Sequence, residues 1–168
     1  MSAILSNKMS FVNFQFLMVF IVASCFPLQF RSQMHEIKLE ELEAHMRIEK
    51  RQVVVFFHTE WCKYCKAMEL GSFKKDEVVK ILDDSYYFIS INAEDENDID
   101  FLGQLYHWRR TGKFSGYHEI LSVFFGKDPV AYPSVFILDS SYHILSKNES
   151  FLSPHQLIEL LDYYKLSS

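Results

Sequence analysis

Two cysteines, Cys62 and Cys65, stand three positions apart in the spacing C-x-x-C. They follow residues 53–57, a continuous apolar run typical of a buried strand, and they begin a segment with helical character. Two intervening residues allow a disulfide to close across the first turn of a helix. A helix N-terminus stabilises an anion, so we expect the Cys62 thiol to ionise below the value of about 8.5 of free cysteine. Because thiolates attack disulfides, Cys62 is the predicted nucleophile and Cys65 the resolving thiol.

The spacing of the cysteine pair also allows two other interpretations. C-x-x-C is also half of a structural zinc site, which needs four ligands. The only other cysteine, Cys25, lies in the N-terminal segment. The histidines that could contribute form no paired motif: His58, His107 and His118. A purely structural disulfide would have little to staple between a strand and a helix. The pattern favours a redox-active pair without a metal, and Lys63 adds a positive charge that favours the Cys62 thiolate.

The elements that must position this pair follow from hydrophobic periodicity and capping signals. The predicted strands cover residues 52–58, 86–91, 134–138 and 143–145, and the last two form a hairpin. The predicted helices cover residues 36–50, 61–70 with a continuation over 76–82, and a final helix that begins at Ser153 and Pro154. Alternating strands and helices of this kind predict an α/β domain with a mixed central sheet flanked by helices on both faces.

Two segments carry a family resemblance. Residues 53–66 (VVVFFHTEWCKYCK) resemble the first core strand and active-site turn of thioredoxin-like proteins. Residues 132–138 (YPSVFIL) resemble the second signature of that family, a cis-proline that precedes a strand. The residues after the cysteine pair are similar to the exported, thioredoxin-related branch of the family, and the resemblance covers roughly residues 36–164.

This resemblance implies a thioredoxin-like fold and a set of site residues. Cys62 would be the nucleophile and Cys65 the resolving thiol, with no cofactor or metal. Pro133 would be cis and lie beside Cys62, so that the preceding backbone groups could pair with an extended substrate strand. The supporting residues of the site would be Glu60, Trp61, Lys63, Tyr64, Tyr132 and Pro133.

The sequence departs from the thioredoxin pattern at three places. Lys63 and Tyr64 replace the Gly-Pro dipeptide of cytosolic thioredoxins, so their strongly reducing potential does not carry over. Phe56 stands where thioredoxins bury an aspartate that accepts the proton of the second cysteine, which leaves Glu60 or water as the base. An insertion over about residues 97–130 precedes the cis-proline strand.

The insertion is rich in apolar and aromatic residues, and two interpretations of it remain open. It could be a packed subdomain that covers a sheet edge, or a partner-binding surface beside the site. A helix is predicted over residues 117–126, with Gly126 as its stop. The acidic residues 94–100 are most simply a solvated turn. His58, four residues before Cys62, could tune the thiol or be a capped surface histidine.

Residues 1–33 are set apart as an export segment. Residues 9–30 carry no charge, and an apolar block over 16–22 is followed by Ala23 and Ser24, as in a secretory signal peptide. A retained membrane anchor is the alternative, although polar residues interrupt the run. Residues 22–25 also resemble a bacterial lipobox, which makes Cys25 a lipidation candidate; ordinary signal-peptidase cleavage nearby is equally compatible.

Composition sets the remaining limits. A chain of 168 residues, 49% of them hydrophobic, has room for one domain, here residues 34–168. The net charge of −5 argues against a general nucleic-acid binder. The sequence therefore predicts a thiol–disulfide oxidoreductase for exported proteins, periplasmic or membrane-anchored, with protein thiol or disulfide substrates and a redox recycling partner. The alternative is a thioredoxin-fold binding or scaffold protein with a non-catalytic cysteine pair.

Overall fold

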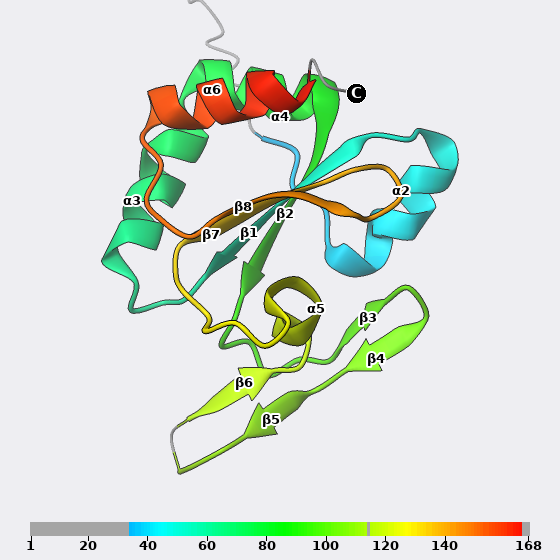
Figure 1. Cartoon of the computed structure of the whole chain (residues 1–168), viewed down its shortest axis with the longest axis vertical. Helices are drawn as coiled ribbons and strands as arrows, with labels where there is room; N and C mark the ends of the chain where they lie inside the picture. The colour runs from blue at the N-terminus through cyan, green and yellow to red at the C-terminus, as the bar shows by residue number, and fades with distance from the viewer. Residues whose placement is uncertain (1–33, 114, 166–168) are drawn as a thin grey trace, which may run out of the picture. The chain divides into compact units, whose positions relative to one another are not determined.

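A four-stranded mixed sheet forms the centre of the domain in a computed structural model, which describes residues 34–113 and 115–165 (Figure 1). The predicted export segment and Cys25 lie outside these residues. The strands are β2 (Tyr86–Asn92), β1 (Gln52–His58), β7 (Ser134–Leu138) and β8 (Ile144–Asn148), in that spatial order. β1 and β2 are parallel, whereas β7 is antiparallel to both β1 and β8. β1 and β7 are thus paired on both sides, which explains their continuous apolar sequences.

One face of the sheet is covered by three α-helices and a short 3₁₀ helix. These are α3 (Lys63–Leu70), η2 (Ser72–Lys74), α4 (Asp76–Ser85) and α6 (Pro154–Lys165). Because side chains alternate along a strand, Val54 and Phe56 of β1 point to this face. They join a buried cluster that also contains Cys62, Cys65 and Met68. The cysteine pair is therefore anchored in the core on this side.

The opposite face is covered by η1 (Leu39–Glu41), α2 (Leu42–Ile48) and α5 (Leu121–Phe125). Phe57 of β1 and Phe136 of β7 point to this side and meet the phenylalanines of α5. The ring centroids of Phe57 and Phe124 are 4.9 Å apart, and those of Phe125 and Phe136 are 5.0 Å apart. The predicted helix over residues 36–50 is thus a 3₁₀ turn followed by a shorter α-helix, and it starts after an isolated bridge between Glu36 and Phe88.

The insertion forms two short hairpins and α5. Its strands are β3 (Ile99–Phe101), β4 (Gln104–Tyr106), β5 (Trp108–Arg110) and β6 (Gly116–His118), with pairs β3–β4 and β5–β6. Of this insertion, α5 packs on a face of the sheet, where its apolar residues join the buried cluster around Phe57 and Phe136. Residues 117–126 are helical only from Leu121. A Cβ at Gly116 would lie 2.4 Å from the Trp108 ring, so glycine permits the close pairing of β5 with β6.

Two predicted boundaries are confirmed by the structure. Gly126 ends α5 with a φ of 61°, a backbone conformation that glycine adopts without steric cost. α6 begins at Pro154, and the Ser153 hydroxyl and Gln156 side chain hydrogen-bond across its first turn. Within the described part of the chain, no helix combines the length and apolar character needed to cross a bilayer.

Candidate active site

The cysteine pair is a disulfide at the start of α3. The Cα atoms of Cys62 and Cys65 are 5.2 Å apart and the sulfur atoms 2.06 Å apart. Cys62 is the N-cap residue of α3 in an extended conformation, and its sulfur accepts a hydrogen bond of 3.1 Å from the Cys65 backbone N–H. The sulfur of Cys62 therefore takes the place of a capping oxygen, where helix N–H groups stabilise a negative charge.

The turn from β1 to α3 fixes this geometry. The backbone N–H of Cys62 donates to the Thr59 carbonyl at 3.2 Å, and the Lys66 N–H donates to the Cys62 carbonyl at 3.1 Å. The Ala93 N–H, just after β2, donates to the His58 carbonyl at 2.9 Å. The ends of the two parallel strands are thus held together just before the turn that leads to the disulfide.

The two cysteines differ in access to solvent. Cys62 is 5% exposed and Cys65 is fully buried. Beside them, the aromatic side chains of Trp61 and Tyr64 are 69% and 67% exposed. The Tyr64 ring lies 6.2 Å from that of Phe151, which is itself partly exposed. The surface around the disulfide is therefore aromatic, while Lys63, also exposed, begins α3.

The second signature lies next to the first. The Tyr132–Pro133 peptide bond is cis. Ser134 pairs with Phe57 in the sheet register, so the segment after the proline lies beside the end of β1. The rings of Tyr132 and Trp61 meet edge to face, with centroids 6.2 Å apart. Burial raises the pKa of Tyr132 to about 12, and the Glu94 carboxylate acts in the same direction, so the phenol stays neutral.

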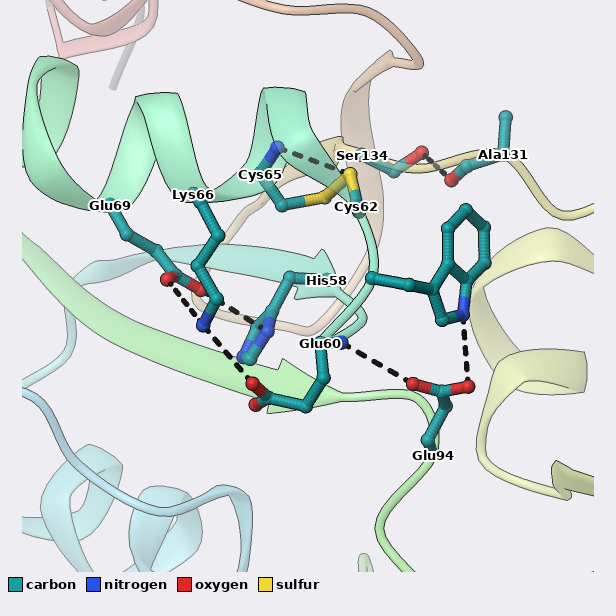
Figure 2. Close-up of a disulfide and its surroundings, with 10 residues drawn as sticks. His58, Glu60, Cys62, Cys65, Lys66, Glu69, Glu94, Ala131 and Ser134 are labelled. Atoms are coloured by element: carbon teal, nitrogen blue, oxygen red, sulfur yellow. Dashed lines mark hydrogen bonds and ion pairs between the residues drawn. A yellow bond between two sulfur atoms is a disulfide. The ribbon is translucent and has the colours of Figure 1, made fainter.

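Glu94 is a site residue that the sequence analysis missed. Its carboxylate accepts a hydrogen bond of 2.9 Å from the Trp61 indole N–H and one of 3.3 Å from the Glu60 backbone N–H (Figure 2). The acidic turn was predicted to be merely solvated. The parallel register pairs His58 with Asn92, so residues two positions beyond each strand meet at the same sheet edge. That parallel pairing was the signal that could have identified Glu94.

A polar cluster lies on the other side of the disulfide, as Figure 2 shows. His58 Nδ1 is 3.2 Å from Glu69 Oε1, and Lys66 Nζ is 3.1 Å from Glu69 Oε2 and 3.3 Å from Glu60 Oε2. These contacts raise the pKa of Lys66. Burial lowers the pKa of His58, and the Glu69 carboxylate opposes this shift. Glu60 itself is largely exposed, so its carboxylate faces solvent and Lys66.

The structure brings most of the predicted residues together. Cys62 and Cys65 form the disulfide, and the residues close to it in the fold are Trp61, Tyr64, Tyr132 and Pro133. Among the described residues, no group of three or more histidine, cysteine, aspartate or glutamate side chains could hold a metal ion. The arrangement can cycle between a disulfide and two thiols, with one sulfur at the helix N-terminus and the other beneath it.

Comparison with known proteins places the chain in a family. Similar solved structures include a DsbH oxidoreductase, with a TM-score of 0.58 and 12% identity over 88% of this chain and 99% of that one. A thioredoxin from Thermus thermophilus has a TM-score of 0.55 and 16% identity over 78% and 86% of the two chains. A thioredoxin-fold protein from Helicobacter pylori has a TM-score of 0.54 and 12% identity over 69% and 70%.

These structures share the fold. No curated protein matches the sequence significantly. The sequence profile described as thioredoxin-like matches residues 34–140, more than half of the chain, and includes the cysteine pair and the cis-proline. Profile, sheet order and the disulfide at the start of α3 agree, and the chain belongs to the thioredoxin-like family.

Proposed function

We propose that this protein is a thiol–disulfide oxidoreductase that acts on exported proteins through Cys62 and Cys65. The observation that carries the proposal is the disulfide across the first turn of α3, with the Cys62 sulfur at the N-cap. On reduction, that position favours a thiolate at Cys62, because helix N–H groups and the helix dipole stabilise the anion.

The exchange proceeds in two steps. The Cys62 thiolate attacks one sulfur of a substrate disulfide, and the other substrate sulfur leaves as a thiolate. The Cys65 thiolate then attacks the Cys62 sulfur, the Cys62–substrate bond breaks, and the second substrate thiol is released. Two electrons pass from the cysteine pair to the substrate, and a recycling partner must restore the dithiol. The same steps in reverse oxidise a substrate dithiol.

The surroundings of the disulfide suit a polypeptide substrate. Trp61, the residue before Cys62, and Tyr64, which lies between the two cysteines in sequence, expose large aromatic surfaces. Pro133 and Tyr132 border the site, and their backbone could pair with an extended chain, as in β-strand addition. Lys63 adds a positive charge at the start of α3. Such a surface binds unfolded or extended protein segments through aromatic contacts and backbone hydrogen bonds rather than through a deep pocket.

Export is the part of the proposal that rests on sequence alone. The charge-free residues 9–30, with small residues at their end, support secretion or anchoring outside the cytoplasm. A lipid on Cys25 would anchor the mature domain to a membrane surface, whereas cleavage nearby would release it. In both forms the domain over residues 34–168 would meet exported proteins.

Reduction of insulin by dithiothreitol tests the enzymatic part of the proposal. We expect the protein to accelerate insulin precipitation and the Cys62→Ser variant to lose this acceleration. A protein that leaves the rate at the dithiothreitol background, with no difference between wild type and variant, would instead be a binding or scaffold protein with an idle cysteine pair.

A further inference from the structure

Two aromatic side chains that the exchange chemistry does not use lie next to each other at the start of α3. Tyr64 stands between the two cysteines in the sequence, in the first turn of α3, and Phe151 belongs to the loop between β8 and α6. Their ring centroids are 6.2 Å apart, and the ring planes are tilted by 51°. Tyr64 is 67% exposed and Phe151 is 38% exposed. The two rings therefore form an open apolar surface that begins within the C-x-x-C turn itself.

The loop that carries Phe151 is anchored on both sides of this residue. The Ser72 hydroxyl donates a hydrogen bond of 2.6 Å to the Leu152 carbonyl, and the Leu152 side chain joins the buried cluster that contains both cysteines. On the other side, the Ser150 backbone N–H and hydroxyl both donate to the Asn148 side chain at 3.1 Å. Figure 1 shows this loop passing alongside α3, in agreement with the ring contact. Phe151 is thus presented at the surface by neighbours that are themselves held in place.

A pair of exposed rings in contact differs from a single exposed apolar residue, which is common on protein surfaces. An apolar side chain that lies across both rings would be in contact with two aromatic groups at once. The anchored loop also reduces the ordering cost of binding on the side of Phe151. The pair is therefore suited to bind one further apolar side chain.

The proposed reaction determines what that side chain belongs to. A substrate sulfur must reach Cys62, which is two residues before Tyr64. An extended polypeptide advances about 3.3 Å per residue, so the side chains within a few residues of the reacting cysteine lie over the C-x-x-C turn. The occupant of the aromatic pair is therefore a side chain of the same polypeptide that undergoes exchange.

We propose that Tyr64 and Phe151 form a subsite for an aromatic or large aliphatic side chain close to the reacting cysteine of the substrate. The inference rests on the proposed function and names its substrate class, namely extended segments in which a cysteine has an apolar neighbour. Cysteines and large apolar residues are both mostly buried in folded proteins. Such segments are therefore exposed chiefly in proteins that have not completed folding, and the subsite selects these over folded ones.

A set of peptide disulfides measures this preference. Each peptide carries one cysteine joined to thionitrobenzoate, with phenylalanine at one of the positions within two residues of the cysteine, and the reference peptide has serine there. The Cys62 thiolate bonds to the peptide sulfur, and the coloured nitrobenzoate thiolate leaves with the electron pair of the broken bond. Cys65 then bonds to Cys62 and releases the peptide thiol. Absorbance gives the second-order rate constant, and we expect the best phenylalanine peptide to react about three- to tenfold faster than the reference.

The readout is the ratio of the two rate constants within one protein, so a variant with a less reactive Cys62 or incomplete folding still gives a valid ratio. Phe151→Ser and Tyr64→Ser should each bring this ratio close to one, whereas Phe151→Tyr, which keeps a ring, should retain most of it. The control is Tyr163→Ser on α6, which removes a tyrosine of nearly equal exposure, 65%, and should keep the wild-type ratio.

Binding can also be followed without exchange chemistry. Forms of the two peptides with serine in place of cysteine are titrated into the oxidised protein, and NMR spectra are recorded. With the phenylalanine peptide, resonances of Tyr64 and Phe151 should shift at lower peptide concentration than with the reference peptide. Equal titration curves for the two peptides would contradict the subsite.

A wild-type ratio near one, or a ratio unchanged in both Phe151→Ser and Tyr64→Ser, would overturn the inference. A ratio lost in Trp61→Ser but kept in those two variants would also overturn it, because the preference would then belong to the Trp61 ring. The proposed function fails separately. A protein that prefers the phenylalanine peptides but never reduces insulin has the subsite without that function, and one that reduces insulin with a ratio of one has the function without the subsite.

Discussion

Cys62 and Cys65 differ in their access to solvent and in their surroundings. The Cys62 sulfur caps α3 and remains slightly exposed, whereas Cys65 is fully buried one turn further along. The positions of both were predictable from spacing, because C-x-x-C after a buried strand places the first cysteine at a helix start. Glu94 and Glu69 were not predictable in this way. Glu94 reaches Trp61 because β1 pairs with β2, and Glu69 reaches His58 because α3 packs against β1. Such contacts between distant segments cannot be read from the local sequence around either glutamate.

Glu94 is expected to position Trp61. Removal of the carboxylate in Glu94→Ala deletes its bonds to the Trp61 indole and the Glu60 backbone. Because each hydrogen bond is worth about 0.5–1.5 kcal/mol, we expect insulin reduction to slow roughly two- to tenfold. The matched control is Glu96→Ala, two residues along the same turn, where the carboxylate pairs with the exposed Arg110. Glu94→Ala as active as Glu96→Ala would remove Glu94 from the site.

His58 is expected to make stability depend on pH. Its pKa in the folded protein is lowered by burial below the unfolded value of about 6.5. The unfolded chain therefore binds more protons, and the stabilising contribution is complete above about pH 6.5 and is lost as the pH falls through the folded pKa. Urea unfolding below about pH 6.5 should show a shallower loss of stability in His58→Gln than in wild type. The control is His155→Gln, at an exposed histidine of α6 that pairs with Glu159, and it should keep the wild-type dependence of stability on pH. The same pH dependence in His58→Gln as in wild type would contradict the burial argument.

Among the elements, those with continuous apolar runs or clear caps were predicted well. β1 and β7 lie between neighbouring strands, β2 at the edge of the sheet still buries most of its apolar run, and α6 begins at Pro154 as predicted. The predicted strand over residues 143–145 begins one residue before β8 and ends three residues before it does. The second half of β8 is polar because this edge strand pairs only with β7, so its sequence carries no apolar run. Residues 117–120 were predicted helical because their apolar spacing continues that of α5, but pairing with β5 makes part of them a strand. Long-range pairing overrode the local pattern.

α5 is expected to stabilise the fold through its phenylalanines. Phe124 is buried against Phe57 and Phe136, with ring centroids 4.9 and 5.5 Å apart. Phe124→Ala should lower the free energy of unfolding by about 3–5 kcal/mol, since it leaves a cavity over the sheet. Val123→Ala, on the exposed side of the same helix, should cost under about 0.5 kcal/mol. Urea titrations of the two variants with equal midpoints would show that α5 does not complete the core.

Over the whole molecule, the sequence joins a candidate export segment to a thioredoxin-like domain. On that domain, the side chains of Trp61 and Tyr64 beside the disulfide are exposed to solvent. The insertion contributes α5, which packs on the face of the sheet opposite α3. An exchange site of this kind suits a compartment in which disulfides persist. The candidate export segment and the disulfide site, which lie in separate segments of the chain, are thus consistent with each other.

A reporter fusion tests whether the N-terminal segment directs export. Residues 1–33 joined to a reporter that is active only after export should give an active reporter. If the segment ends in a lipoprotein signal, palmitate labelling of the full chain should disappear in Cys25→Ala, with Cys62→Ala as the control that keeps the label. An inactive, cytoplasmic reporter would contradict export of this chain.

Mixed-disulfide trapping tests most directly the central claim that Cys62 attacks and Cys65 resolves. Reduced Cys65→Ser and Cys62→Ser are each mixed with oxidised insulin, and adducts are identified by mass spectrometry without reductant. Cys65→Ser should accumulate a reductant-sensitive adduct through Cys62, because no thiol is left to resolve it. Cys62→Ser should form almost none, since its remaining thiol is fully buried. An adduct mainly through Cys65, or none in either variant, would contradict the mechanism.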